Sequence, residues 1–360
     1  MSILDFFRKL LKRPEVENVQ SVEQPQPQAQ PKRPEERYIL CIDGGGMRGI
    51  IPVVLLQQLE KSIRENGGDK DIASYFDLIA GTSTGGLIAL ALSCDSTLEH
   101  KACADTKQVS LEKLLESYMT MGEEIFQAKA SLFGIRQIAD NKYHSSGIQN
   151  YAKRLFGDLT MNQAKVPTLV MAYDLSTGSD QMIRSYGDEG LYPAWVAARA
   201  TSAAPTYFEP YEYEGKLLAD GGVIANNPVI YAYFEAKKLY PECEKFHILS
   251  MSTGGTYHTM VKDDTYGLIS WGNQVVPMYG TAQKRTSDYV LNNIKDAEYL
   301  RLDDPLPETV KMDETNQAVL RMVCGHAYEG AMKHQSEIND FAARLVSNME
   351  NKDASETGRA

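Results

Sequence analysis

The 360-residue sequence predicts an α/β fold with a largely parallel central sheet that helices cover on both faces. Three observations support this prediction. Apolar segments of strand length recur along the chain. Helical patterns separate several of these segments, as the crossover connections of a parallel sheet require. Two of the segments end in glycine-rich turns that run directly into a helical pattern, and with 43% apolar residues the chain can bury the core of one large domain.

The two ends of the chain differ from its centre. Residues 1–13 place apolar side chains beside four basic residues, which predicts a basic amphipathic helix able to lie in a membrane interface. A partner-docking helix or a frayed tail is the alternative. Residues 14–36 hold five prolines and many glutamines, which predicts a disordered linker. We expect one folded domain over 37–349 and a frayed tail over 350–360.

Strands and helices are expected in alternation along the domain. The expected strands are 38–42, 75–80, 168–173, 182–186, 216–219 and 246–251. The expected helices are 49–63, the small-residue stretch after 85, 111–125, 193–200, 229–240 and an amphipathic stretch at 314–349. Residues 126–138 fit neither period, so they form either a cover over a site or an insertion.

A turn of three glycines, Gly44 to Gly46, follows the first expected strand. Asp43 precedes it and is interpreted as a turn former. The segment Gly44 to Gly49 satisfies G-x-G-x-x-G, the fingerprint of dinucleotide-binding proteins. That reading needs an acidic residue at the end of the next strand, where this chain has Gly81 instead. No G-K-[ST] follows the glycines, so a phosphate-binding P-loop is also disfavoured.

The segment Gly81 to Gly85 has the pattern G-x-S-x-G between an apolar strand and a stretch of small residues. This is the nucleophile elbow of serine hydrolases, in which the glycines let strand and helix approach and the serine projects from the sheet edge. Ser83 is therefore the predicted nucleophile, with an ordinary serine in a strand–helix turn as the alternative. The glycine turn before it would then supply backbone N–H groups to an oxyanion.

A serine hydroxyl needs a proton acceptor, which is usually a histidine held by a carboxylate. None of the six histidines lies in a segment that resembles the loop from which such a base is presented. Asp220, by contrast, ends an apolar strand and is followed by Gly221 and Gly222. We therefore interpret Asp220 as the base. The turn at Asn226 and Asn227 is interpreted as a pin for the loop.

Taken together, these segments resemble the patatin-like phospholipases. The family's hallmarks are D-G-G-G-x-R-G, G-x-S-x-G and D-G-[GA], and all three occur here in the family's order: Asp43 to Gly49, Gly81 to Gly85, and Asp220 to Gly222. Residues 200–208 and 250–254 are similar to two further family segments. The resemblance spans about residues 38–255. It implies nothing about the two ends of the chain.

The resemblance implies a three-layer α/β/α sandwich with a helical C-terminal region and a lipid acyl hydrolase that cleaves membrane phospholipids. It implies a Ser83–Asp220 dyad, an oxyanion hole of Gly44, Gly45 and Gly46 supported by Arg48, and neither metal nor cofactor. Acyl transfer from the same acyl-serine is the alternative. Malonyl transferases of this fold carry a histidine just before the serine, where this chain has Thr82.

Charge and cysteine content restrict the possible partners. The net charge of -11 offers no broad attraction to nucleic acid or to anionic membranes, so any membrane contact must be local. Five scattered cysteines without C-x-x-C spacing disfavour a disulfide framework and a zinc site. The sequence has no apolar run long enough to span a membrane and no signal-peptide pattern. These features predict a cytoplasmic enzyme, either free or peripheral at a membrane.

Overall fold

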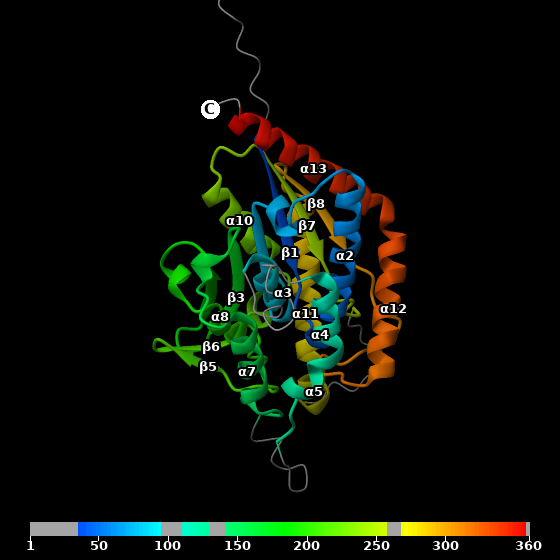
Figure 1. Cartoon of the computed structure of the whole chain (residues 1–360). Helices are drawn as coiled ribbons and strands as arrows, with labels where there is room; N and C mark the ends of the chain where they lie inside the picture. The colour runs from blue at the N-terminus through cyan, green and yellow to red at the C-terminus, as the bar shows by residue number, and fades with distance from the viewer. Residues whose placement is uncertain (1–34, 95–109, 130–140, 258–267, 358–360) are drawn as a thin grey trace, which may run out of the picture. The chain divides into compact units, whose positions relative to one another are not determined.

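A computed structural model describes residues 35–94, 110–129, 141–257 and 268–357 (Figure 1). The helix predicted at 1–13 and all but the last two residues of the predicted linker lie outside these ranges. So does most of the 126–138 segment. Within the described ranges, no helix is apolar over a long enough stretch to cross a membrane.

Eight strands form one mixed sheet in the order β5-β6-β3-β2-β1-β7-β8, with β4 paired to β3 off this path. Their bounds are β1 Glu36–Ile42, β2 Leu78–Thr82, β3 Thr168–Asp174, β4 Ser179–Arg184, β5 Tyr211–Tyr213, β6 Lys216–Asp220, β7 Lys245–Met251 and β8 Ala297–Leu302. The neighbours from β3 to β8 in this order are parallel, whereas β4, β5 and β6 pair antiparallel. The predicted α/β class and mainly parallel sheet are confirmed.

The central strand β1 explains why the sheet is covered on both faces. It pairs with β2 and β7, and Tyr38 to Ile42 are all buried. Ile39 and Cys41 point into one hydrophobic cluster, whereas Leu40 and Ile42 point into the other. A strand that is apolar on both faces can be buried only between two layers of helices.

Helices fill those two layers (Figure 1). Their bounds are α2 Ile50–Glu65, α3 Thr84–Ser93, α4 Leu111–Thr120, α5 Gly122–Ile125, α7 Ser145–Phe156, α8 Ala194–Thr201, α9 Gly222–Ala225, α10 Val229–Leu239, α11 Leu268–Asn292, α12 Gln317–Lys333 and α13 Gln335–Thr357. Buried residues of α10 and α11 join the cluster of Ile39, and those of α2, α3, α12 and α13 join the cluster of Leu40. The C-terminal region is helical, as expected.

Several expected boundaries were wrong. Residues 72–75 form a short 3-10 helix capped by the Asp71 side chain, so β2 begins only at Leu78. The helix expected at 314–349 is two helices, α12 and α13, with the break at His334. The predicted tail at 350–360 instead continues α13 through Thr357. Side chains tie this last stretch to the domain: Lys352 Nζ lies 2.7 Å from an Asp77 oxygen.

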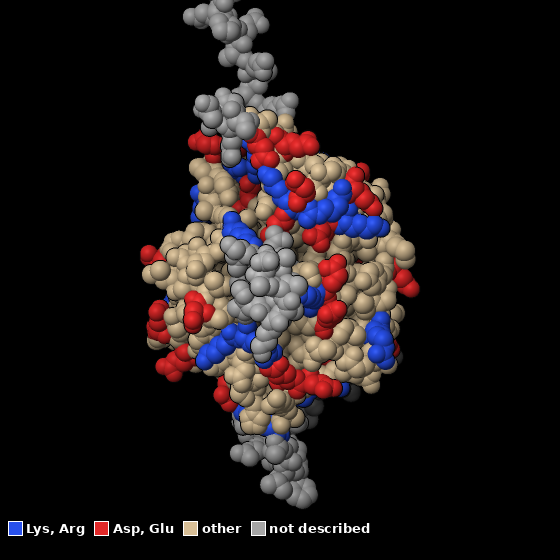
Figure 2. Space-filling model, in the orientation of Figure 1, with Lys and Arg blue, Asp and Glu red and all other residues tan. Residues whose placement is uncertain are grey.

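Two strands were not predicted at all. β5 has only three residues. β8, AEYLRL, has two charged residues, Glu298 and Arg301, among its apolar ones, and it pairs with β7 at the edge of the sheet. On the face shown in Figure 2, the described Lys and Arg side chains are interspersed with Asp and Glu. Such a mixture offers no single-signed patch on this face for a polyanion.

Candidate active site

The sheet brings the three sequence motifs together. Ile42 at the end of β1 lies opposite Gly81 of β2, so the glycine turn and the elbow leave neighbouring strands at the same edge. On the other side of β2, Thr82 pairs with Met171 of β3, and the next β3 residue pairs with Asp220. Ser83 and Asp220 therefore lie at the same end of the central strands, although 137 residues separate them in sequence.

Ser83 has the strained backbone of a nucleophile elbow. Its φ is 55° and its ψ is -124°, a conformation that L-residues rarely adopt. The Ser83 N–H donates to Thr201 Oγ1 at 2.8 Å, and that hydroxyl donates to the Met171 carbonyl at 2.6 Å. A Cβ on Gly81 would lie 2.1 Å from the Gly85 carbonyl oxygen, so only glycine allows the turn. Thr201 was missed from the sequence because its contact is formed only in the folded chain.

Gly44 fixes the glycine turn against the nucleophile. Its N–H donates to the Asn226 carbonyl at 3.0 Å, and its own carbonyl accepts from Asn226 Nδ2 at 3.2 Å and Thr253 Oγ1 at 2.7 Å. A Cβ on Gly44 would lie 3.1 Å from the Ser83 Cβ. The sequence predicted that the Gly44 N–H donates to an oxyanion. In the structure this N–H already donates to Asn226, so it does not fit that role. The predicted role of Asn226 as a loop pin is confirmed.

The next two glycines differ from Gly44 in their N–H groups, and Gly46 lines the pocket that contains Ser83. Among the described residues, the Gly45 and Gly46 N–H groups have no recorded acceptor. Gly46 has a φ of 60° and begins a 3-10 turn, whose first N–H groups have no partner within the turn. The Arg48 guanidinium donates from Nε to the Gly45 carbonyl at 3.2 Å, so this side chain holds the turn. Burial lowers the Arg48 pKa from its usual value.

Asp220 is buried, with 4% of its surface exposed. Its Oδ1 accepts from the Gly222 N–H at 2.7 Å, and the Ser83 side chain is close enough to lower the pKa of the carboxylate. Burial raises the pKa of Asp220 to about 6, and these two contacts partly offset that rise. At neutral pH this carboxylate is charged and can accept a proton. At Gly221 a Cβ would lie 2.4 Å from the Met171 carbonyl oxygen, so the loop requires glycine there.

Three of the described histidines have partners away from the site. His247 bonds Glu36, His326 bonds the Asp304 carbonyl and His334 bonds Glu337. Within the described ranges, no hydrogen bond between a histidine and either Ser83 or Asp220 is recorded. The dyad itself remains a prediction.

Asp43 is held by a residue that the sequence did not reveal. Arg301 Nη1 donates to Asp43 Oδ1 at 2.8 Å and to Ser250 Oγ at 2.6 Å, and Nη2 bonds the second carboxylate oxygen. Both side chains are buried, and the Asp43 carboxylate raises the Arg301 pKa above its usual value. Asp43 is thus the buried partner of a β8 arginine rather than a simple turn former. A basic residue within an apolar strand such as AEYLRL was the available signal.

Replacing Arg301 with methionine is expected to lower the free energy of unfolding by about 3–5 kcal/mol, because Asp43 would keep a buried charge without its partner. Denaturant unfolding of both proteins measures this difference. The control is Lys333→Met, which breaks an exposed pair with Asp304 and should leave stability almost unchanged. Equal effects of the two substitutions would contradict a structural role for the buried pair.

The loop after Asp220 is held by a side chain of α11. Gln283 of α11 accepts from the Asn226 N–H at 3.2 Å and donates to the Val223 carbonyl at 3.3 Å. Met312, in the segment between β8 and α12, accepts the Met47 N–H at 2.8 Å. Neither residue lies in a recognisable motif, so sequence patterns could not identify them.

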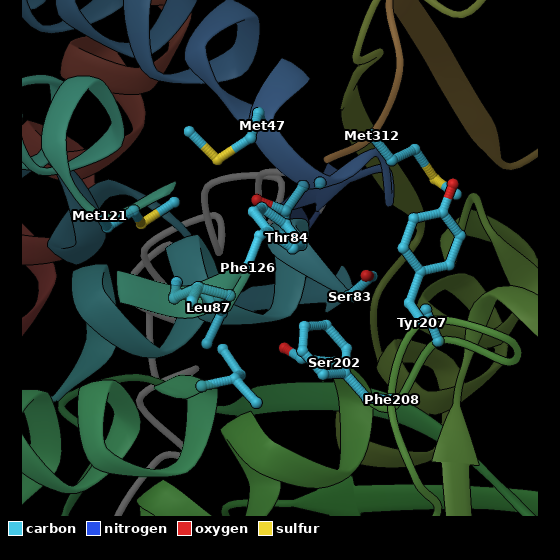
Figure 3. A pocket seen from close by; sticks show the side chains of 14 residues that line it. Met47, Ser83, Thr84, Leu87, Met121, Phe126, Ser202, Tyr207, Phe208 and Met312 are labelled. Atoms are coloured by element: carbon cyan, nitrogen blue, oxygen red, sulfur yellow. The ribbon is translucent and has the colours of Figure 1, made fainter. Parts of the chain in front are cut away.

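Ser83 opens into an apolar pocket (Figure 3). The pocket encloses about 510 Å³ of empty space, part of which is open to solvent. Most of its wall is aliphatic or aromatic: Met47, Leu87, Met121, Ile125, Phe126, Ile148, Phe208 and Met312. Asp313, the residue after Met312, bonds Lys142 and accepts from the Tyr143 hydroxyl at 2.6 Å. A pocket of this composition suits an alkyl chain better than a polar group.

Comparison with known proteins gives consistent matches. A family model described as patatin-like phospholipase matches residues 40–233. Patatin-like protein 1 of Oryza sativa subsp. indica is 27% identical over 86% of this chain and 84% of its own length. Patatin-T5 of Solanum tuberosum is 25% identical over 79% of this chain and 81% of its own. The crystal structure of VipD from Legionella pneumophila aligns with a TM-score of 0.39 and 13% identity, covering 86% of this chain and 67% of that one.

Proposed function

Since the chain belongs to the patatin-like phospholipase family, a family of lipid acyl hydrolases, we propose that it hydrolyses acyl esters of membrane phospholipids through a Ser83–Asp220 dyad. One observation carries this proposal: the strained Ser83 faces an apolar pocket, and its side chain is close enough to the buried Asp220 carboxylate to lower the pKa of that group. Nucleophile, base and acyl site thus meet at one sheet edge.

In the acylation step, Asp220 accepts the Ser83 proton as Oγ attacks the carbonyl carbon of the ester. The charge that develops on the carbonyl oxygen is stabilised by the N–H groups of Gly45 and Gly46. The positive end of α3, which begins at Thr84, adds to this stabilisation. The tetrahedral intermediate then collapses, the bond to the alcohol oxygen breaks, and Asp220 returns its proton to that oxygen.

In the deacylation step, water takes the place of the alcohol. Asp220 accepts a proton from the water, and the resulting hydroxide attacks the acyl carbon while the same two N–H groups stabilise the oxyanion. Collapse releases the carboxylic acid, and Asp220 returns the proton to Ser83 Oγ. The acyl chain lies in the pocket between Leu87 and Phe208 through both steps.

Product analysis tests the proposed reaction. Full-length protein incubated with phosphatidylcholine vesicles, with different acyl chains at the two glycerol positions, should release free fatty acid and lysophospholipid in equal amounts. In ¹⁸O-labelled water, mass spectrometry should find the label in the fatty acid carboxylate, because water cleaves the acyl-Ser83.

Each other product would indicate a different reaction. Acyl esters of an added alcohol that form without ¹⁸O would indicate acyl transfer. Release of the phosphorylated head group would contradict the proposal, and so would intact phospholipid after incubation with the folded protein.

A further inference from the structure

Ser202 is a buried hydroxyl in the wall of the pocket. It follows the last residue of α8, is 8% exposed, and lines the same pocket as Ser83 (Figure 3). Within the described part of the chain its Oγ has no hydrogen-bond partner. Two other buried serines do have one: Ser93 Oγ donates to the Ala89 carbonyl at 2.8 Å, and Ser62 Oγ to Asn339 at 2.7 Å. A buried hydroxyl without a partner destabilises a fold, so such a group calls for a ligand.

The chain on either side of Ser202 is attached to both members of the proposed dyad. Thr201 accepts the Ser83 N–H at 2.8 Å. Ala203 accepts the Asp220 N–H at 3.0 Å through its carbonyl. Ser202 lies between these two contacts, so its position relative to nucleophile and base is set by the backbone rather than by a flexible side chain.

Ser202 also lies across the pocket from the glycine turn. Figure 3 shows it on the side away from Met47, the residue that follows Gly46. An ester presents two oxygens to the site, the carbonyl oxygen and the oxygen that leaves with the alcohol. The carbonyl oxygen faces Gly45 and Gly46 in the proposed reaction. The other oxygen remains for a donor on the opposite wall.

We propose that the Ser202 hydroxyl donates a hydrogen bond to the ester oxygen that leaves with the alcohol, and to the water that occupies the same position during deacylation. This inference rests on the proposed function. Ser202 keeps its own proton in both steps. Asp220 still delivers the proton that the leaving oxygen needs, and the hydrogen bond from Ser202 stabilises the negative charge that develops on this oxygen as the bond breaks.

The test compares two esters of the same fatty acid in Ser202→Ala, a change that removes only the hydroxyl. With an alkyl ester, whose alcohol is a poor leaving group, the acylation rate should fall about tenfold. With the p-nitrophenyl ester, the pre-steady-state burst should change by less than about threefold, because nitrophenolate leaves without help. The melting temperature should stay the same or rise, since a buried unpaired hydroxyl is removed.

Ser93→Ala is the matched control, because it removes a buried serine hydroxyl that has a partner outside the pocket. It should leave both acylation rates unchanged. Equal losses for the two esters in Ser202→Ala, with a lower melting temperature, would overturn the proposal in favour of a structural role. Unchanged rates for both esters would overturn it as well. A folded wild-type protein inactive towards every ester would instead refute the proposed function on which the inference rests.

Discussion

Replacing Ser83 with alanine is expected to lower the rate of ester hydrolysis by about 10⁴-fold or more, because no acyl-enzyme can then form. The fold should persist, since the Ser83 backbone is held by Thr201 rather than by its own hydroxyl. Fatty acid release from phospholipid vesicles by purified protein measures the loss, and circular dichroism checks the fold.

A second variant, Ser83→Gly, tests whether the Ser83 backbone is strained. Glycine adopts positive φ without strain, whereas alanine keeps the Cβ that makes a φ of 55° unfavourable. Both variants should be inactive, but the glycine variant should unfold at a higher temperature than the alanine variant. Activity close to that of wild type in either variant would refute Ser83 as the nucleophile.

Replacing Asp220 with asparagine should lower kcat/KM by about 10³-fold, because the side chain keeps its shape but can no longer accept a proton. Asparagine retains an oxygen for the Gly222 N–H, so the loop should keep its conformation. In the wild-type enzyme, kcat/KM should rise tenfold per pH unit up to about pH 6 and then level off, since the base must be charged and its pKa is raised to about 6. A profile that levels off near pH 4 would contradict this assignment.

The same substitution should change stability in a pH-dependent way. Above about pH 6, Asp220 is charged in the folded protein, and burial makes that charge unfavourable by roughly 3 kcal/mol relative to the unfolded chain, given the rise in pKa from 3.8 to about 6. As the pH falls from 6 towards 4, the folded protein takes up this proton before the unfolded chain does, and the penalty disappears. Asp220→Asn should therefore be more stable than wild type at about pH 7.5, and the difference should fall to about a third of that value at about pH 4.5, as measured by melting temperature. An equal difference at both pH values would show that the gain is not electrostatic.

The sequence predicted the parts of the site that local patterns encode. Ser83, Asp220 and the three glycines lie in short motifs whose strand and turn contexts can be recognised without a fold. The same holds for β1, β3 and β7, which are apolar on both faces because they are central in the sheet. The roles of these residues can be predicted from their immediate neighbours in the sequence.

The rest depends on contacts between distant segments. Thr201, Gln283 and Arg301 act on the site through single hydrogen bonds or ion pairs that only the folded chain creates. β8 escaped prediction because Glu298 and Arg301 interrupt its apolar residues, so this edge strand lacks the apolar run of a central one. The Gly44 N–H donates to the Asn226 carbonyl, and this contact, which leaves Gly45 and Gly46 as the proposed oxyanion donors, could be found only in the folded chain.

The buried pair of Asp43 and Arg301 has a consequence for how this domain can be divided or recombined. The segment that matches the family model ends at residue 233, yet Arg301 comes from β8, well beyond it. A chimera of two relatives joined between α10 and β7 would take the glycine turn from one parent and the arginine that holds its aspartate from the other. We expect such a chimera to keep a working site only when both parents carry the same charge pair. A segment transferred between relatives should therefore extend at least to residue 301.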